Sequence, residues 1–578
     1  MFNMRKSILA TAILAGTLGL TACGGSSDSK EKPVEPVNTA PTDITLSANS
    51  VSENAIAAEV GTLTATDSDS GDTFTFSTSD ERFEISGTSL KLKADTSIDF
   101  EKETSVTVKV SVSDSANNTF EKDLTIEVTD LLDFYGFTSR FEDGESTVSY
   151  SGQIARHVLI KEIYNYIGSD KFVTDAQTLD KAGLQTELDK IYRVTSDDYA
   201  SVWEDRLLTV TTNPTAKQTS LLDISSSHKN IVGKLAGNDS KGQHKDWTDG
   251  TSFKGWDGLT NNTPEGLVDE LFDQLTDRAL IAGGASTPNG LEIDTIYVTA
   301  DGVDLKQLIQ KFLLGAVAFS QGADDYLDND YEGKGLLTDN VNQLDGKTYT
   351  NLEHQWDEGF GYFGAARDYL NYTDTEIAGK VSDEDGRSDW NGKHDTNADD
   401  LIDLKAEFNF GNSTNAAKRD RGATVATDLT KEAMDAFLAG RNLIATTHEA
   451  FTDEQAAELK GYAKTATIAW EKSISATVVH YINDLIADLD KLKGEYSVSD
   501  FTTMAKHFSE MKGFALNLQF NPESPMTSAQ FAEVNTLLGN KPVIVGEAEI
   551  LEYQTQLLEA RNILQAAYDF DADNVQNW

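Results

Sequence analysis

The chain has 578 residues, of which 39% are hydrophobic and 9% aromatic, so it is long enough to form more than one domain with its own core. Its formal net charge is −47, from 95 acidic and 48 basic residues. Such an acidic surface repels nucleic acid and anionic lipid headgroups, and we expect no nucleic-acid partner.

Residues 1–22 are typical of an export signal. Arg5 and Lys6 precede the apolar run ILATAILAGTLGL, which is too short to span a bilayer comfortably. The run ends in LTAC, which resembles the lipobox of bacterial lipoproteins, where the cysteine carries the lipid after cleavage. Cys23 is the only cysteine, so it cannot form an internal disulfide, and lipidation accounts for it. The alternative is an ordinary secretory signal with an incidental cysteine.

The composition after Cys23 predicts a flexible tether over residues 23–37, rich in Gly, Ser, Lys, Glu and Pro. Gly24, rather than an aspartate, follows the cysteine, and by resemblance to lipoprotein sorting signals this favours the outer membrane. No second apolar segment approaches membrane-spanning length. We therefore expect a cell-envelope protein whose partner is the membrane, reached through a lipid anchor.

Residues 38–133 carry an apolar pattern of period two. The runs FTFSTS, FEIS, SLKLKA, SVTVKVSVSD and DLTIEVTD alternate apolar and polar residues and are separated by turn-forming clusters. This pattern predicts an all-β sandwich of about seven strands. Acidic side chains lie between the runs: Glu53, Asp67, Asp69, Asp99, Glu101 and Asp114.

This region resembles a cadherin repeat, because NTAP, SEN, ATDSDSG, DFE and VTD follow in that family's order and spacing. The resemblance implies that these six acidic residues bind calcium at the ends of the sandwich. Cadherin calcium sites lie between consecutive repeats, and only one repeat is present here, so we expect incomplete sites with weak affinity, about 10⁻⁴ to 10⁻³ M. The alternative is a set of solvated acidic loops on a spacer domain.

Residues 134–578 change to a helical pattern, with apolar residues three and four apart in the segments 152–168, 304–327 and 431–451. The clearest helix begins at Thr452, which forms a capping box with Gln455, and continues for about 40 residues. A helix of this length must pack against others. We therefore predict a large all-α helical-bundle domain.

Catalytic signatures such as HExxH and GxSxG are absent, so we expect no enzyme. His354 and Glu358 are four residues apart on one helix face and are a candidate metal site for iron. The alternative is a hydrogen bond inside the core. A second pair, His507 and Glu510, diverges on its helix, and we expect no shared ligand there.

The stretch near 389–411 has the alternating oxygen-bearing side chains of a calcium loop. It departs from the EF-hand pattern because Asp400 stands where glycine is expected, and Ala406 stands at the closing position, with Glu407 one place late. We predict a structural calcium ion in this loop; the alternative is a solvated loop of Asx turns. The expected ligands are Asp395, Asn397, Asp399, the carbonyl of Leu401, Asp403 and Glu407.

The segments SYSGQIARHVLI, EHQWDEGFGYFG, DTNADDLIDLKAEFNFG and HFSEMKGFALNLQFNP resemble an uncharacterised helical domain family carried by bacterial surface lipoproteins. More distantly the region is similar to the imelysin proteins, which are associated with iron uptake and carry a GxHxxE motif. His354 lacks the preceding glycine, and its spacing to Glu358 is HxxxE. We expect a binding lipoprotein for a metal, a metal complex or an envelope protein partner. The alternatives are a calcium-dependent adhesion protein and, third, a peptidase-like enzyme.

Overall fold

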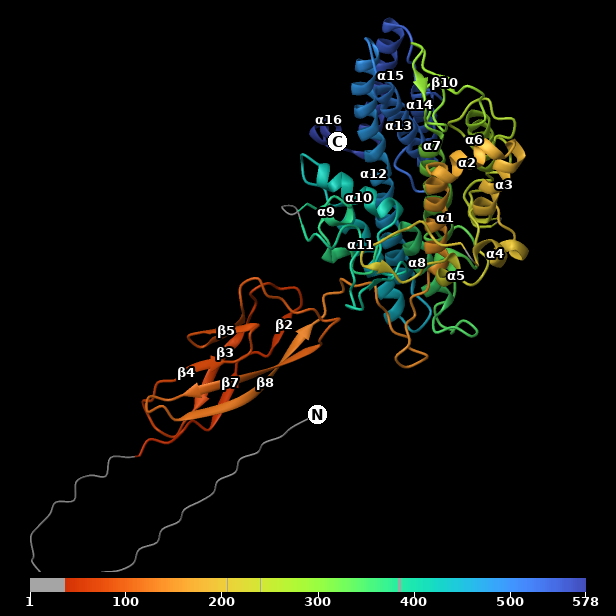
Figure 1. The fold of residues 1–578 in the computed structure, drawn as a ribbon. Helices are drawn as coiled ribbons and strands as arrows, with labels where there is room; N and C mark the ends of the chain where they lie inside the picture. The colour runs from red at the N-terminus through yellow and green to blue at the C-terminus, as the bar shows by residue number, and fades with distance from the viewer. Residues whose placement is uncertain (1–36, 205, 240, 383–385) are drawn as a thin grey trace, which may run out of the picture. The chain divides into compact units, whose positions relative to one another are not determined.

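The computed structural model describes residues 37–204, 206–239, 241–382 and 386–578. The expected signal peptide and Cys23 lie outside these residues, as does all but the last residue of the expected tether. The described residues divide into two compact units, with the border between Leu131 and Leu132 (Figure 1). The expected domain border lies two residues further along the chain.

The first unit is a sandwich of two four-stranded sheets with the strand orders β1-β3-β6-β5 and β2-β8-β7-β4. All neighbouring strands are antiparallel except β2 and β8, which are parallel. The strands are β1 (Asp43–Leu46), β2 (Ser50–Ser52), β3 (Glu59–Thr66), β4 (Thr75–Thr78), β5 (Phe83–Ser86), β6 (Ser89–Leu92), β7 (Ser105–Ser113) and β8 (Thr119–Thr129).

The apolar residues that alternate with polar ones in the sequence are the residues buried in the sandwich. Along β7, Val106, Val108, Val110 and Val112 are buried, while the residues between them face outward. Each inward side chain packs in a core that both sheets share, and the polar face stays in water. The predicted β-sandwich is confirmed.

The second unit is helical, with sixteen α-helices among the described residues, which confirms the predicted fold class. The helices are α1 (Ser151–Ile167), α2 (Asp170–Thr178), α3 (Lys181–Tyr192), α4 (Ser196–Trp203), α5 (Leu221–Ile224), α6 (Pro264–Ala279), α7 (Leu305–Leu313), α8 (Asn351–Phe363), α9 (Asp374–Ile377), α10 (Gly411–Gly422), α11 (Leu429–Thr446), α12 (Asp453–Leu492), α13 (Val498–Ala515), α14 (Ser528–Leu538), α15 (Glu547–Tyr568) and α16 (Ala572–Asn577). Short strands accompany them: β9 (Thr215–Ala216), β10 (Ala285–Ser286), β11 (Glu292–Ile293) and β12 (Leu401–Ile402).

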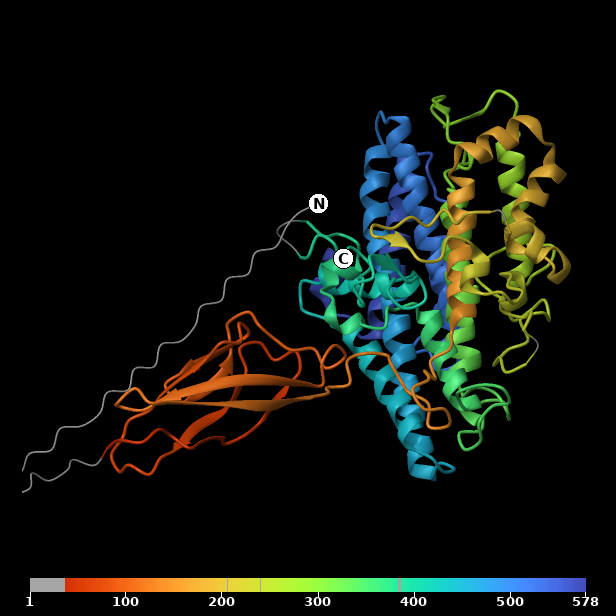
Figure 2. The same cartoon turned by 60° about the horizontal axis from the view of Figure 1, so that its bottom comes forward.

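The 40-residue helix α12 is the central helix against which others of this unit pack. Thr452 and Gln455 form the predicted capping box at its start. Helices α11, α13 and α15 lie side by side with α12, as Figures 1 and 2 show. Its fully buried Trp470 belongs to the single core cluster of this unit. None of the described helices combines the length and the apolar character that a membrane span requires.

Helix α7 does not end as an ordinary α-helix. Two π-helical turns follow it, η2 (Leu314–Phe319) and η3 (Gly322–Tyr326). The sequence predicted one helix over 304–327, and periodicity alone did not reveal these wider turns. A π turn carries an extra residue per turn and is often found at functional sites. Here η3 brings the adjacent carboxylates of Asp324 and Asp325 into the interior, where both side chains are fully buried.

Candidate functional site

A cavity of about 430 Å³ lies in the helical unit between α1, α7, α10 and α13. Three of the four segments that carry the family resemblance line it, through His157, through 408–411, and through Glu510. The fourth segment lies behind His157, because the Tyr362 carbonyl oxygen is 3.0 Å from its Nε2 atom. The cavity is therefore where these separate segments meet.

Three lysines from three different helices line the cavity: Lys161 on α1, Lys311 on α7 and Lys418 on α10. Among the described residues, Lys161 and Lys418 form no hydrogen bond or ion pair, although the Lys161 ammonium lies 5.3 Å from the centre of the Phe408 ring. Burial lowers the pKa of Lys161. Burial and the positive charge of Lys311 lower the pKa of Lys418 to about 8.

The third lysine is partly compensated. The Nζ atom of Lys311 lies 3.4 Å from Oε1 of Glu510, and it donates hydrogen bonds to the side-chain oxygens of Gln307 and Gln310 at 3.1 and 2.7 Å. Oε2 of Glu510 is buried without a hydrogen-bond partner in the described structure. Burial lowers the pKa of His157 to about 4, so this side chain is neutral. Three cations therefore face one carboxylate.

Aromatic rings complete the wall: Tyr164, Phe408, Phe410, Tyr481 and Phe514. Apolar walls with a few fixed charges are typical of pockets for small molecules. Sequence reasoning missed this site because its lysines come from three helices far apart in the chain, and no local spacing relates them. A larger cavity of about 530 Å³, lined by acidic residues of α3 and α6, shares no residue with the resembling segments.

The pair His507 and Glu510 diverges, as the sequence predicted. Nδ1 of His507 lies 2.7 Å from Oδ2 of Asp488 on α12, whereas Glu510 turns to the cavity. The sequence analysis assigned Glu510 no role. The structure places it beside Lys311, with its side chain 6% exposed.

The predicted sandwich ligands fall into separate groups. Asp67 and Asp69 gather with Asp72, which the sequence analysis did not include, and one oxygen of each lies within 4.8 Å of the others. Asp114 faces the negative charge of Asp69, and it accepts a hydrogen bond from Nδ2 of Asn118 at 2.9 Å. Calcium at this group stays a prediction.

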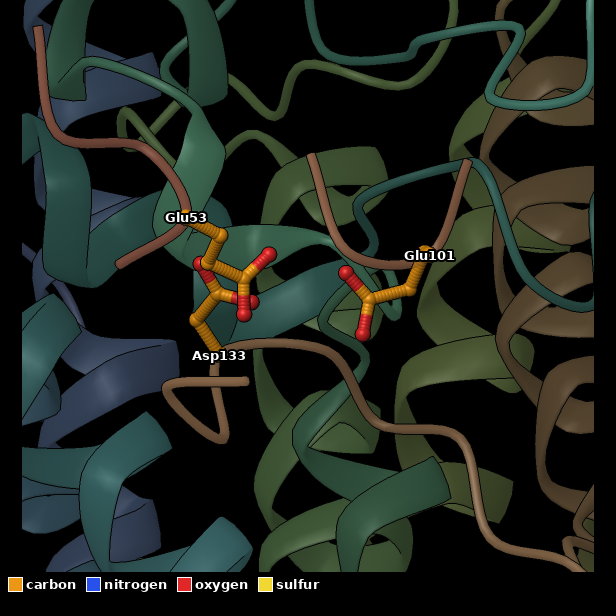
Figure 3. A group of neighbouring side chains, drawn as sticks. All are labelled: Glu53, Glu101 and Asp133. Atoms are coloured by element: carbon orange, nitrogen blue, oxygen red, sulfur yellow. The ribbon is translucent and has the colours of Figure 1, made fainter. Parts of the chain in front are cut away.

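Glu53 and Glu101 form the second group, and Figure 3 shows their carboxylates facing one another. Glu53 is fully buried and accepts hydrogen bonds from the backbone N–H groups of Phe100 and Leu131 at 2.9 and 2.7 Å. Asp99 is not part of this group in the described residues; its carboxylate pairs with Lys102 at 3.0 Å. The Glu53 carboxylate therefore already holds two chain segments together by hydrogen bonds.

The acidic loop is closed by its own hydrogen bonds. Asp395 accepts the N–H groups of Asp399 and Asp400 at 3.2 and 2.9 Å, and Oδ1 of Asn397 accepts the N–H of Asp399 at 3.0 Å. Leu401 lies in β12, and its N–H donates to Oδ1 of Asp399 at 3.0 Å. These contacts are Asx turns.

Glu407 is the closing residue of the loop, as the sequence predicted, but its carboxylate closes the loop by accepting hydrogen bonds from backbone N–H groups. Its carboxylate is buried and accepts the N–H groups of Thr396 and Asp403 at 2.9 and 2.7 Å. Asp403 itself accepts a hydrogen bond from Nε2 of Gln218 at 2.9 Å. In the described part of the chain, the carboxylates of this loop do not gather in a group of three. Calcium binding here stays a prediction.

His354 and Glu358 lie near each other without forming a closed metal site. Nε2 of His354 is 3.7 Å from Oε1 of Glu358, and its Nδ1 is 3.0 Å from the Ser149 carbonyl oxygen. Glu358 accepts a hydrogen bond from Nε2 of Gln153 at 2.7 Å. Within the described ranges, no third histidine, cysteine or carboxylate joins them. Iron binding through His354 stays a prediction.

These features define a two-domain protein, a β-sandwich followed by a large helical domain with an internal cavity. Residues 135–540 match the family described as Domain of unknown function (DUF4856), and the chain belongs to this family. The cavity lies within the matched region.

Two solved structures are similar to part of the chain. One is described as "PcdhgB3 EC1-4 in 50 mM HEPES" (21% identity, TM-score 0.13), and the match covers 16% of this chain and 24% of that one. The other is described as "Crystal structure of the Protocadherin GammaB4 extracellular domain" (20% identity, TM-score 0.15, 19% of this chain and 18% of that one). The chain thus spans a quarter or less of the length of either. No curated protein matches.

Proposed function

We propose that the protein is a lipoprotein of the cell envelope whose helical domain binds a small anionic molecule in the cavity between α1, α7, α10 and α13. The anchor is Cys23, and its support is the lipobox-like sequence LTAC after the export signal. The β-sandwich would serve as a spacer between membrane and binding domain, with calcium as its stiffening ion.

The observation that carries this proposal is the positive charge of the cavity. The whole chain has a net charge of −47, yet three lysines and one glutamate are the charged side chains that line this space. Lys161 and Lys418 form no ion pair with a carboxylate among the described residues. A carboxylate or phosphate group would give both ammonium groups charge-assisted hydrogen bonds, at about 1.5–3 kcal/mol each.

In this proposal iron would bind as part of an anionic complex in the cavity, and not as a bare ion at His354 and Glu358. His354 and Glu358 offer two ligands to a bare ion, whereas the cavity offers ammonium groups to an anionic complex. An iron chelate of a polycarboxylate carries negative charge on its outside and suits the lysines without any direct metal ligand from the protein. Comparing the binding of citrate alone with the binding of ferric citrate therefore distinguishes a site for a simple anion from a site for an iron complex.

The test is titration calorimetry on the full chain carrying Cys23→Ser, with citrate, ferric citrate and inorganic phosphate as probes. We expect at least one probe to bind, and binding to weaken tenfold or more in Lys418→Met and in Lys161→Met. Lys431→Met is the matched control, because this exposed lysine on α11 pairs with Asp435 away from the cavity. Equal binding by all variants, or no binding of any probe to the folded parent, would contradict the proposal.

A further inference from the structure

The loop after η3 contains an acidic pattern that the sequence analysis did not use. Residues 328–339 read DNDYEGKGLLTD, with Asp328, Asp330 and Glu332 at positions 1, 3 and 5 of a twelve-residue loop. Gly333 stands at position 6 with φ of 80°, a left-handed conformation that glycine adopts without strain. Position 12 is Asp339. This is the EF-hand spacing of calcium ligands, including the glycine that the loop at 395–407 lacks.

The structure brings two of these side chains together with one from the preceding helical turn. One carboxylate oxygen from each of Asp324, Asp328 and Asp330 lies within 4.8 Å of the others. Asp339 does not join them; its carboxylate accepts the N–H of Val341 at 2.8 Å. Asp324, in the middle of the π turn η3, stands in for the closing ligand of the loop.

A buried oxygen at this group has no hydrogen bond. Asp324 is fully buried; its Oδ1 accepts a hydrogen bond from the backbone N–H of His244 at 2.9 Å and lies 2.8 Å from Nδ1 of the same residue. Its Oδ2 has no hydrogen-bond partner in the described structure, and neither has Oδ2 of Asp328. The indole N–H of Trp247 acts as a weak hydrogen-bond donor to the Asp324 carboxyl and lowers its pKa, although the contact falls outside ordinary hydrogen-bond geometry. Buried oxygens without donors are costly, and a cation between them would remove that cost.

The donor set selects the ion. All three side chains offer carboxylate oxygens, which suit a hard divalent cation rather than zinc or copper. His244 is held by Asp324 through Nδ1 and does not belong to the group. A twelve-residue loop with exposed acids, among them Glu332, suits the larger coordination number of calcium better than the strict octahedron of magnesium.

We infer that the loop 328–339 binds one calcium ion through Asp324, Asp328 and Asp330. The ion would join the π turn η3 to the loop that leads to η4 (Gly335–Leu337). Both η3 and η4 pack on α8. The ion would therefore hold the C-terminal end of the helical segment that starts with α7 in its position against α8.

The test uses terbium as a luminescent substitute for calcium on the full chain carrying Cys23→Ser, with excitation through tryptophan. Residues 38–131 contain no tryptophan or tyrosine, so the β-sandwich offers a bound ion no sensitiser of its own. Trp247 lies next to Asp324, and we expect a terbium signal that calcium displaces. The variant Asp330→Asn, at an exposed position, should weaken terbium binding tenfold or more and keep the fold, checked by circular dichroism.

Asp395→Asn is the matched control, because Trp390 lies near the other loop and could sensitise an ion there. Calcium-displaceable luminescence that is lost in Asp330→Asn and kept in Asp395→Asn supports the inference. Luminescence that is absent, or that only Asp395→Asn removes, overturns it. Equilibrium dialysis should agree, with one calcium ion fewer per chain in Asp330→Asn than in the parent; an unchanged number would also overturn the inference.

Discussion

Arg441 and Asp357 form an ion pair that is completely buried in the helical unit, with Nε of the arginine 2.9 Å from Oδ1 of the aspartate. Arg441 also lies 3.1 Å from Glu353, and the Tyr135 hydroxyl donates to Asp357 at 2.8 Å. The network joins α8 and α11 to the segment that enters the helical unit. Because every charge has a partner, its burial is tolerated.

Removing one member of this network leaves uncompensated charge in the core. We expect Arg441→Met to lower the free energy of unfolding by about 3–5 kcal/mol, the range for broken buried ion pairs. Chemical denaturation of the full chain, followed by tryptophan fluorescence, measures it. The matched control is Lys431→Met, which breaks an exposed pair and should cost less than about 1 kcal/mol. A similar effect of both substitutions would disprove this view of the network.

Two helical glycines offer a second test, on packing. A methyl group on Gly440 of α11 would lie 2.1 Å from Cζ2 of Trp356, which is fully buried. We expect Gly440→Ala to destabilise the protein by about 1–3 kcal/mol, as overpacking does. Gly461 of α12 is exposed with open space around it, so Gly461→Ala should stabilise by about 0.5–1 kcal/mol. Thermal unfolding of both variants should show shifts of opposite sign.

The elements with strong local patterns could be predicted from sequence. The alternation in β7 and the capping box at Thr452 each contain the whole physical cause of the element, so these predictions were confirmed. The cavity could not be predicted, because Lys161, Lys311 and Lys418 meet only through tertiary packing. For the same reason the sequence could not show that His354 has the Ser149 carbonyl oxygen 3.0 Å from its Nδ1 and the Glu358 carboxylate 3.7 Å from its Nε2; iron binding there stays a prediction.

A buried glutamate predicts a pH dependence of stability. Glu471 accepts hydrogen bonds from Asn521 and Tyr568 at 2.6 and 2.7 Å, yet burial outweighs them and raises its pKa to about 7. Between about pH 4.5 and about pH 7 the folded state keeps a proton that the unfolded state has lost. The contribution of this residue to stability is therefore largest below pH 4.5 and falls as pH rises through that window, by up to about 3 kcal/mol.

The variant Glu471→Gln should lack this pH-dependent component, so its stability relative to the parent should increase from about pH 5 to about pH 8. Urea unfolding across that range measures the difference. Glu523→Gln is the control, because hydrogen bonding and ion pairing with Lys464 lower the pKa of Glu523 and place its effect below the same window. Parallel pH curves for parent and Glu471→Gln would show that the raised pKa is not a property of the folded protein.

The β-sandwich predicts a calcium effect of its own. With Asp67, Asp69 and Asp72 within 4.8 Å of one another, calcium should stabilise this unit by relieving carboxylate repulsion. Millimolar calcium should raise its unfolding temperature in the parent and have a smaller effect in Asp69→Asn. Asp123→Asn, at an exposed position on β8, is the control. Sedimentation in the same buffers also tests the adhesion alternative, which requires self-association on calcium addition.

The last prediction concerns the reactivity of Lys418. With its pKa lowered to about 8, roughly half of these side chains are neutral at pH 8, against well under one in a hundred for a lysine of ordinary pKa. Only the neutral amine reacts with an acylating reagent, so at limiting reagent Lys418 should be acetylated roughly tenfold faster than the exposed Lys431, as peptide mass spectrometry would show. An anion that occupies the cavity should slow acetylation of Lys418 and leave Lys431 unchanged. Equal rates at the two lysines, with and without the anion, would mean that the cavity does not hold Lys418 as a desolvated, uncompensated cation.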